Sequence, residues 1–332
     1  IKEAVRARAS AAIYITHDLA VVAQVSDRIM VLRDGDLVEE GNTRTLLADP
    51  QENYTRRLLS VRSSRSKRVV AEETNLVLNV EGVTARYPGT QVDVLCDIDL
   101  QVERGRTVAV VGESGSGKST LARVITGLLP PIQGRVSFAG RQLSASLSKR
   151  NKDELQRIQM IYQMPDVALN PRQRVSEVIG RPLQFYLGLK GQALKARIGD
   201  LLEKIELPTE YMDRFPEQLS GGEKQRVCIA RALAAEPDLI ICDEVTSALD
   251  QLVAEDILKL LEQLQSDLAV SYLFITHDLA TVKAIADHVV VMHQGVIVEK
   301  GPKADILSPP HAPYTELLLS SVPEMDPDWL DT

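Results

Sequence analysis

A glycine-rich segment between an apolar run and a helical pattern constrains the fold more than any other part of the sequence. The run Thr107–Val111 is rich in valine, residues 112–120 read GESGSGKST, and a helical pattern starts at Leu121. This order matches G-x-x-x-x-G-K-[ST] in the strand–loop–helix setting that the motif requires. The glycines let the backbone wrap closely, so that N–H groups and the start of the helix face phosphate oxygens. We therefore predict a loop that binds a nucleoside triphosphate through Gly112, Ser114, Gly115, Ser116, Gly117, Lys118, Ser119 and Thr120.

A pair of acidic residues after a second apolar run predicts the other half of the site. Residues 239–242 are Leu-Ile-Ile-Cys, and Asp243 and Glu244 follow. The carboxyl ends of parallel strands share one edge of a sheet, so we expect both carboxylates next to the phosphate loop. There Ser119 would ligate Mg²⁺, Asp243 would hold the ion through water, and Lys118 would reach the β- and γ-phosphates. Glu244 would polarise the attacking water as a general base, although adjacent acids after a strand also fit a simple helix cap.

Short β-branched runs alternate with helical patterns from Leu76 onward. We expect buried strands at Thr107–Val111, 239–242, 272–275 and 288–292. Fully apolar runs of this length, separated by helices, indicate an α/β domain with a largely parallel sheet.

Residues 219–226, LSGGEKQR, open another helical stretch. A Ser-Gly-Gly turn at a helix start offers N–H groups, a hydroxyl and the helix dipole to an anion. With this turn the sequence resembles the ATP-binding-cassette (ABC) ATPases, whose signature is LSGGQ-like. The resemblance implies ATP and Mg²⁺ as ligands and a P-loop NTPase fold with a mostly parallel sheet, an antiparallel β subdomain and a helical signature subdomain. It also implies that two cassettes meet head to tail, so that Ser220, Gly221 and Gly222 complete the nucleotide site of the partner cassette.

Other motif positions of the family follow in the same order. By resemblance, Gln163 contacts Mg²⁺ and the attacking water and senses the membrane partner, and Asp250 belongs to the loop that crosses the dimer interface. His277 matches the switch histidine that contacts the γ-phosphate. Tyr87 matches the aromatic residue that stacks on adenine. Taken alone, Tyr87 is better explained by packing and His277 is an ordinary strand-end histidine, so their roles depend on order and spacing.

Two positions depart from the family pattern. Val245 stands where the family usually has proline, which changes local stiffness but removes no catalytic atom. Glu223 replaces the commoner glutamine of the signature, where the backbone, the serine and the glycines contact phosphate. ATP binding is therefore still expected.

An internal repeat connects the two ends of the chain. Residues 15–60 align without gaps with residues 275–320 at a constant offset of 260 (275 − 15), and both copies contain ITHDLA. Gap-free register over this length indicates duplication of a structural unit. Because the first copy starts so close to Ile1, we expect a tandem-cassette subunit that is truncated at its N-terminus.

The repeat predicts how the chain divides. The first copy contains His17, the counterpart of the switch histidine, but neither a phosphate loop nor a signature. We therefore expect the chain to bind ATP but to hydrolyse it poorly unless two copies pair. The expected segments are 1–60, the C-terminal fragment of a first ABC domain; 61–75, a polar basic linker; 76–322, a complete ABC domain with a peptide-importer-type extension; and 323–332, an acidic tail.

Peripheral motifs point to one branch of the family. Residues 168–172 (ALNPR), the loop GESGSGKST and residues 308–315 (SPPHAPYT) resemble the oligopeptide/dipeptide-import ATPases. Two such cassettes in one polypeptide resemble the fused peptide or glutathione importer subunits of bacteria. The resemblance implies an ATPase at the cytoplasmic face of the inner membrane that drives two transmembrane permease subunits. A periplasmic or extracellular solute-binding protein would be an indirect partner. The surface near Gln163 and 166–174 would transmit the closing and separation of the two cassettes to the permease subunits.

Composition narrows the alternatives. Lys and Arg number 38 against 46 Asp and Glu, and the net charge of −8 argues against a nucleic-acid binder that relies on bulk positive charge. Cys96, Cys228 and Cys242 are widely scattered, which argues against a disulfide framework or a cysteine-rich metal site. No apolar run approaches the roughly 20 residues needed to span a bilayer. The alternative is a soluble tandem ABC protein that acts on ribosomes or nucleic acid; the peptide-type tail and the short linker favour the importer.

Overall fold

The computed structural model describes residues 5, 7–8, 10–16, 18–33, 35–60 and 76–321. These residues form two compact units, an N-terminal unit and a larger unit built around 76–249 and 256–319. The expected linker, the expected acidic tail and His17 lie outside the described residues.

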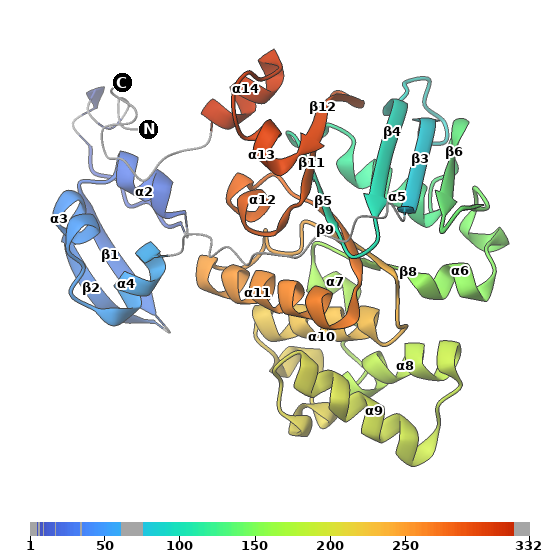
Figure 1. Cartoon of the computed structure of the whole chain (residues 1–332). Coiled ribbons are helices and arrows are strands. Elements are labelled where there is room, and N and C mark those ends of the chain that lie inside the picture. The colour runs from blue at the N-terminus through green and yellow to red at the C-terminus, as the bar shows by residue number, and fades with distance from the viewer. Residues whose placement is uncertain are drawn as a thin grey trace. The chain divides into compact units, whose positions relative to one another are not determined.

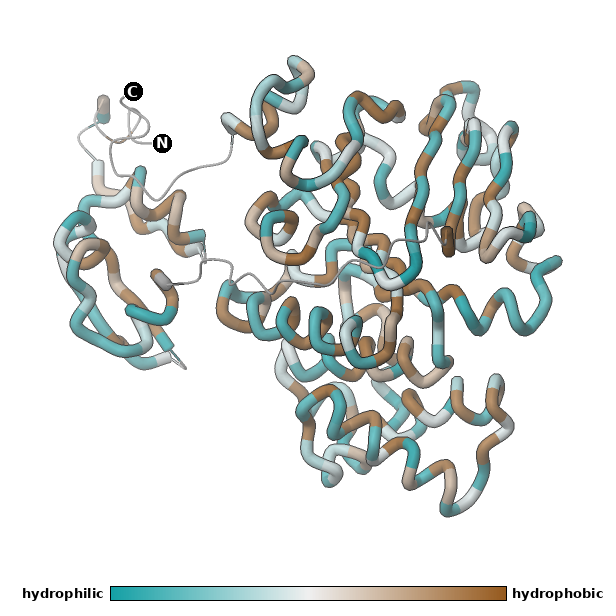
Figure 2. Tube along the Cα trace, viewed as in Figure 1, coloured by the Kyte–Doolittle hydropathy of each residue, from teal (hydrophilic) through white to brown (hydrophobic). Residues whose placement is uncertain are grey.

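A six-stranded sheet forms the centre of the larger unit (Figure 1). Its strand order is β12-β11-β5-β10-β9-β8, and every neighbouring pair is parallel except β11 and β12. Every residue of β5 and β10 is buried. The trace through the centre of the larger unit is accordingly mostly brown in Figure 2. The predicted buried strands and the mostly parallel sheet are thus confirmed. The strands are β5 (Thr107–Val111), β8 (Ile158–Ile161), β9 (Leu239–Asp243), β10 (Ser271–Ile275), β11 (His288–His293) and β12 (Val296–Pro302).

A second, antiparallel sheet of four strands has the order β4-β3-β6-β7. Its inward side chains share one apolar core with the six-stranded sheet and with α5 (Lys118–Thr126), including Leu121 and Ile125 of that helix. This core fixes the helix that follows the phosphate loop. The strands are β3 (Leu76–Ala85), β4 (Leu95–Glu103), β6 (Gln133–Phe138) and β7 (Arg141–Gln142).

The remaining helices of the larger unit connect the strands and form a helical subdomain. In that subdomain α8 contacts α9 and α10, and α10 also contacts α7. The helices are α6 (Lys152–Arg157), α7 (Pro165–Ala168), α8 (Val175–Leu187), α9 (Gly191–Lys204), α10 (Gly221–Leu233), α11 (Gln251–Leu268), α12 (Leu279–Ile285), α13 (Lys303–Ile306) and α14 (Pro313–Ser320), with 3-10 turns η1 (Leu147–Lys149), η2 (Thr209–Asp213) and η3 (Pro216–Gln218).

The N-terminal unit repeats the last elements of the larger unit. Asp18 accepts backbone N–H groups at the start of α2, as Asp278 does at the start of α12. The pairing of β1 with β2 has the register of β11 with β12, including the same irregularity after the fourth residue of the first strand. The sequence repeat is therefore also a structural repeat. Its elements are α2 (Leu19–Val25), β1 (Arg28–Arg33), β2 (Asp36–Asn42), α3 (Thr43–Ala48) and α4 (Asn53–Ser60).

Candidate nucleotide site

The predicted phosphate loop leaves the carboxyl end of β5 and enters α5. Gly112 has a φ of 151° and Gly117, the N-cap of α5, a φ of 104°. A Cβ atom on Gly112 would lie 2.1 Å from the carbonyl oxygen of Met292, and one on Gly117 would lie 2.9 Å from Cδ2 of Leu95. Backbone conformation and close packing therefore both require glycine at these two positions.

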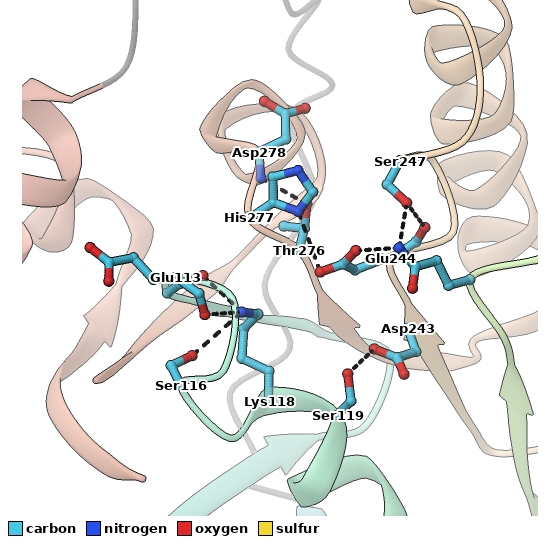
Figure 3. A network of polar contacts seen from close by, with 12 residues as sticks. Glu113, Ser116, Lys118, Ser119, Asp243, Glu244, Ser247, Thr276, His277 and Asp278 are labelled. Carbon is cyan, nitrogen blue, oxygen red and sulfur yellow. Dashed lines mark hydrogen bonds and ion pairs between the residues drawn. The ribbon is translucent and has the colours of Figure 1, made fainter. Parts of the chain in front are cut away.

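Lys118 is buried within this loop (Figure 3). Its ammonium donates hydrogen bonds to the carbonyl oxygens of Gly112 and Glu113, both at 2.8 Å, and lies 3.4 Å from Oγ of Ser116. Burial lowers the pKa of Lys118, and nearby carboxylates, Glu244 first among them, oppose that shift. The predicted phosphate-binding cation is thus oriented by the loop itself.

Ser119 and Asp243, the predicted ligands of Mg²⁺, lie together although they are far apart in the sequence. The Ser119 hydroxyl donates to Oδ1 of Asp243 at 3.0 Å. Burial raises the pKa of Asp243, and the hydrogen bond from Ser119 opposes the shift. A hydroxyl and a carboxylate are oxygen donors of the kind that Mg²⁺ uses together with phosphate oxygens and water. Among the described residues no cluster of three or more His, Cys, Asp or Glu side chains is suited to a metal.

Glu244 lies between two other predicted catalytic residues, as Figure 3 shows for His277. One carboxylate oxygen, Oε1, is 3.3 Å from Nδ1 of His277, and the other, Oε2, accepts a hydrogen bond from Nε2 of Gln163 at 2.7 Å. The same Gln163 amide lies 3.2 Å from Oγ of Ser247. The hydrogen bonds of Gln163 therefore go to Glu244 and Ser247 rather than to the Ser119–Asp243 pair.

Tyr87, the expected adenine-stacking residue, is tied to the helix behind the phosphate loop. Its hydroxyl lies 3.1 Å from Oγ1 of Thr120 and accepts a hydrogen bond from Arg123 at 2.8 Å. The Arg123 guanidinium also lies 5.9 Å from the centre of the Tyr87 ring. The tyrosine thus has a fixed position next to the loop, with its ring half-buried.

The predicted signature residues lie apart from this cluster. Ser220 caps α10 by accepting the N–H of Glu223 at 3.4 Å, and Gly221 and Gly222 form the first turn of that helix. Asp250 accepts the N–H of Val253 at 3.1 Å at the start of α11. Ser220 and Gly221 are exposed.

Three residues near the site were not predicted to act there. Ser247 contacts Gln163, Arg123 contacts Tyr87, and the hydroxyl of Tyr314 accepts a hydrogen bond from the N–H of Glu113 at 3.1 Å. A sequence signal existed for two of them: Ser247 opens the Ser-Ala-Leu-Asp segment that resembles the dimer-interface loop of the family, and the repeat carries Tyr54 at the position of Tyr314. All three contacts depend on tertiary structure.

Two protein-family models match parts of the chain. A family model described as "ABC transporter" matches residues 95–247, and one described as "Oligopeptide/dipeptide transporter, C-terminal region" matches residues 298–332. The chain belongs to the ABC transporter family. Its match to the second model places this ABC protein among the oligopeptide/dipeptide-type members.

Curated relatives of this ABC protein carry a more specific name. The glutathione import ATP-binding protein GsiA of Salmonella paratyphi A is 37% identical over 95% of this chain and 56% of its own length. The protein of that name from Escherichia coli K12 is 36% identical over the same shares. The chain thus spans about half the length of the curated relatives it matches.

Solved structures of ABC ATPases have the same fold. The protein cbiO1 of Clostridium perfringens, part of the ABC transporter complex cbiONQ, matches with a TM-score of 0.63 and 29% identity over 69% of this chain and 89% of its own. A dimeric ATP-binding cassette in a post-hydrolysis state with ADP and phosphate matches with a TM-score of 0.60 and 28% identity, over 68% of this chain and 98% of its own. Within the described part of this ABC protein, no helix combines the length and apolar character needed to cross a membrane.

Proposed function

We propose that the chain is an ATP-hydrolysing, energy-coupling subunit of an ABC importer for peptides or a related small solute such as glutathione. The observation that carries the proposal is the position of Glu244, which contacts both His277 and Gln163 at the strand end beside the phosphate loop. The printed names of the relatives and the match to the oligopeptide/dipeptide C-terminal region support import rather than action on ribosomes or nucleic acid.

Each residue of the site then has a chemical role. Lys118 and the loop N–H groups bind the phosphates, and Tyr87 stacks on adenine. Ser119 and Asp243 would hold Mg²⁺, which would neutralise charge on the phosphates. Gln163, whose amide donates to Glu244, would contact the attacking water. Glu244 accepts a proton from the attacking water, and His277 contacts the γ-phosphate.

The signature serves a second cassette. Ser220 and Gly221 are exposed, and the helix start they form suits an anion. We infer that two cassettes pair head to tail and act on two permease subunits at the cytoplasmic face of the membrane, with a solute-binding protein as an indirect partner. In this proposal the N-terminal unit is the C-terminal part of a first ABC domain, as its repeated elements suggest.

Nucleotide binding by the full chain tests the first part of the proposal. Lys118→Ala removes the ammonium that the loop orients, so we expect the micromolar affinity for Mg²⁺–ATP to be lost in an equilibrium titration. Lys149→Ala, at an exposed lysine of η1, is the matched control and should bind as the unaltered chain does. Retained micromolar affinity in Lys118→Ala contradicts the assigned role.

The import assignment needs a separate measurement. Co-expression with the candidate permeases should give a complex that takes up radiolabelled glutathione or dipeptides into vesicles in an ATP-dependent way. Co-sedimentation of the chain with ribosomes, with no association with membrane subunits, would reverse the assignment.

A further inference from the structure

The C-terminal extension reaches the phosphate loop through one side chain. Tyr314 belongs to α14, and its hydroxyl accepts the hydrogen bond of the Glu113 N–H at 3.1 Å. The two residues are 201 positions apart in the sequence. None of the roles assigned above to the phosphate loop includes this contact.

The peptide group that Tyr314 contacts is the one that orients Lys118. It joins Gly112 to Glu113: its N–H donates to Tyr314, and its carbonyl oxygen, that of Gly112, accepts a hydrogen bond from the Lys118 ammonium at 2.8 Å. The next carbonyl, that of Glu113, accepts from the same ammonium at 2.8 Å. One planar peptide is therefore held by the tyrosine at one end and by the lysine at the other.

Tyr314 itself is fixed by the hairpin of β11 and β12. Its ring lies on the imidazole of His293 at the end of β11, with centroids 4.0 Å apart and planes at 33°. Glu299 of β12 accepts the N–H of Ala312 at 3.1 Å, immediately before α14. Because β11 is also the parallel neighbour of β5, which carries the loop, the tyrosine hydroxyl has a defined position relative to Glu113.

The first copy of the repeat builds the same support. Arg33, at the position of His293, lies over the ring of Tyr54 at 5.2 Å. Glu39, at the position of Glu299, accepts the N–H groups of Gln51 and Glu52 at 2.8 and 3.2 Å. Residues 1–75 contain no phosphate-loop motif, so Tyr54 is a tyrosine in matched surroundings within a unit that has no such loop of its own.

We propose that Tyr314 is a positioning residue of the nucleotide site. It fixes the Gly112–Glu113 peptide, and through that peptide it orients the Lys118 ammonium toward the phosphates. The proposal rests on the proposed nucleotide binding. Without the hydroxyl the Glu113 N–H loses its hydrogen-bond partner, and the peptide gains conformational freedom. Ordering the loop when nucleotide binds then costs more free energy.

The test compares three forms of the full chain: unaltered, Tyr314→Phe and Tyr54→Phe. Tyr314→Phe keeps the ring on His293 and removes only the hydroxyl. In a titration with a non-hydrolysable fluorescent ATP analogue and Mg²⁺, we expect its Kd to rise about three- to tenfold, as for one lost hydrogen bond. The KM for ATP should rise in step while kcat stays the same, and Tyr54→Phe should change neither.

Hydrogen exchange of the loop amides in nucleotide-free protein provides a readout that does not depend on ATP binding. Faster exchange of the Glu113 N–H in Tyr314→Phe, with an unchanged thermal unfolding midpoint, supports the positioning role. An unchanged Glu113 exchange rate, an unchanged Kd, or an equal Kd change in both variants overturns it. Failure of the unaltered chain to bind nucleotide would instead contradict the proposed function, and the exchange rate would still decide the role of Tyr314.

Discussion

At the scale of single residues, the conformation of Glu244 explains how its side chain reaches the site. Its φ is 49°, in the left-handed region that a residue with a side chain occupies at a cost of about 1 kcal/mol or more. The Glu244 N–H donates to the carbonyl of Ile275 at 2.9 Å, and its own carbonyl accepts from the N–H and the hydroxyl of Ser247. These bonds hold the strained turn and direct the carboxylate between His277 and Gln163.

Substitution of this carboxylate should separate binding from hydrolysis. Glu244→Gln keeps the size of the side chain and removes the base, so we expect nucleotide affinity to be retained. Turnover should fall on the order of 10²-fold or more, equivalent to about 3 kcal/mol of barrier. Single-turnover phosphate release by the assembled complex measures the effect, and a near-normal rate would show that Glu244 is not the base.

The residues of the phosphate loop were predictable, whereas some of their contacts were not. Lys118 and Ser119 occupy set positions in a strand–loop–helix motif, and Asp243 follows a buried strand that must end at the same edge of the sheet. The contact of Tyr314 with Glu113 depends on how α14 packs against β11 and β12. No local pattern encodes a hydrogen bond between residues 201 positions apart.

At the scale of elements, Glu223 connects the start of α10 to the 3-10 turn η2. Its carboxylate accepts the N–H of Ser220 at 2.7 Å and the hydroxyl of Tyr211 in η2. Burial alone would raise the pKa of Glu223, but these hydrogen bonds outweigh burial and lower it, so the side chain is ionised at neutral pH. Glu223, which replaces the glutamine usual in the family, therefore has its own hydrogen-bond partners in Ser220 and Tyr211.

Removal of this link should destabilise the chain moderately. Glu223→Ala leaves the Ser220 N–H and the Tyr211 hydroxyl without their acceptor, and we expect the free energy of unfolding to fall by about 1–2 kcal/mol. Glu223→Gln keeps an acceptor of the same length and should lose less. Urea unfolding at pH 7 compares the two variants, and equal stability of the alanine and glutamine forms would contradict the capping role.

Asp238 joins two other elements and should make stability depend on pH. Its carboxylate accepts from Arg104 at 2.7 Å and from Arg157 at the end of α6. Burial alone would raise the pKa of Asp238, yet the hydrogen bonds of the two arginines outweigh it and lower the pKa below its ordinary 3.8. The pKa of Asp238 is thus lower in the folded than in the unfolded state. The stabilisation from its two arginine contacts is therefore present above the unfolded-state pKa and is lost as pH falls through the folded-state pKa.

We therefore expect Asp238→Asn to reduce the free energy of unfolding at pH 7 by about 1–3 kcal/mol. The variant should also show a shallower loss of stability below about pH 4, because it lacks the carboxylate that protonates there. Asp153→Asn is the control. Asp153 also pairs with Arg157, but the side chain of Asp153 is 69% exposed, so its substitution should change stability little. Parallel acid-denaturation curves of the Asp238 variant and the unaltered chain would count against this assignment.

At the scale of the whole molecule, the repeat shows which properties local sequence determines. The hairpins of β1 with β2 and of β11 with β12 have the same bounds after the offset and the same register irregularity. Burial differs: Met30 and Leu32 are 60% and 59% exposed, whereas their counterparts Val290 and Met292 are 5% and 0% exposed. β11 has β5 as a second neighbour, and among the described residues β1 pairs with β2 alone. Element type and register follow from the sequence, while burial depends on tertiary neighbours.

The separation of the signature from the phosphate loop leads to a prediction about pairs of chains. A Cβ atom on Gly221 would meet only Cδ2 of Leu249, at an ordinary 3.7 Å, and an acidic residue is compatible with the first turn of a helix. Gly221→Asp should therefore fold, yet it places a carboxylate where the phosphates of the partner chain would bind. We expect this variant and Lys118→Ala each to have little ATPase activity alone.

Mixing the two variants in equal amounts should restore activity. Random exchange makes half of the dimers mixed, and each mixed dimer has one intact pair, the loop of the Gly221→Asp chain with the signature of the Lys118→Ala chain. If each site turns over independently, the mixture should reach about a quarter of the activity of the unaltered chain. The activity per chain of the unaltered protein should also rise with concentration, as association requires. An inactive mixture together with concentration-independent activity would show that a single chain completes its own site.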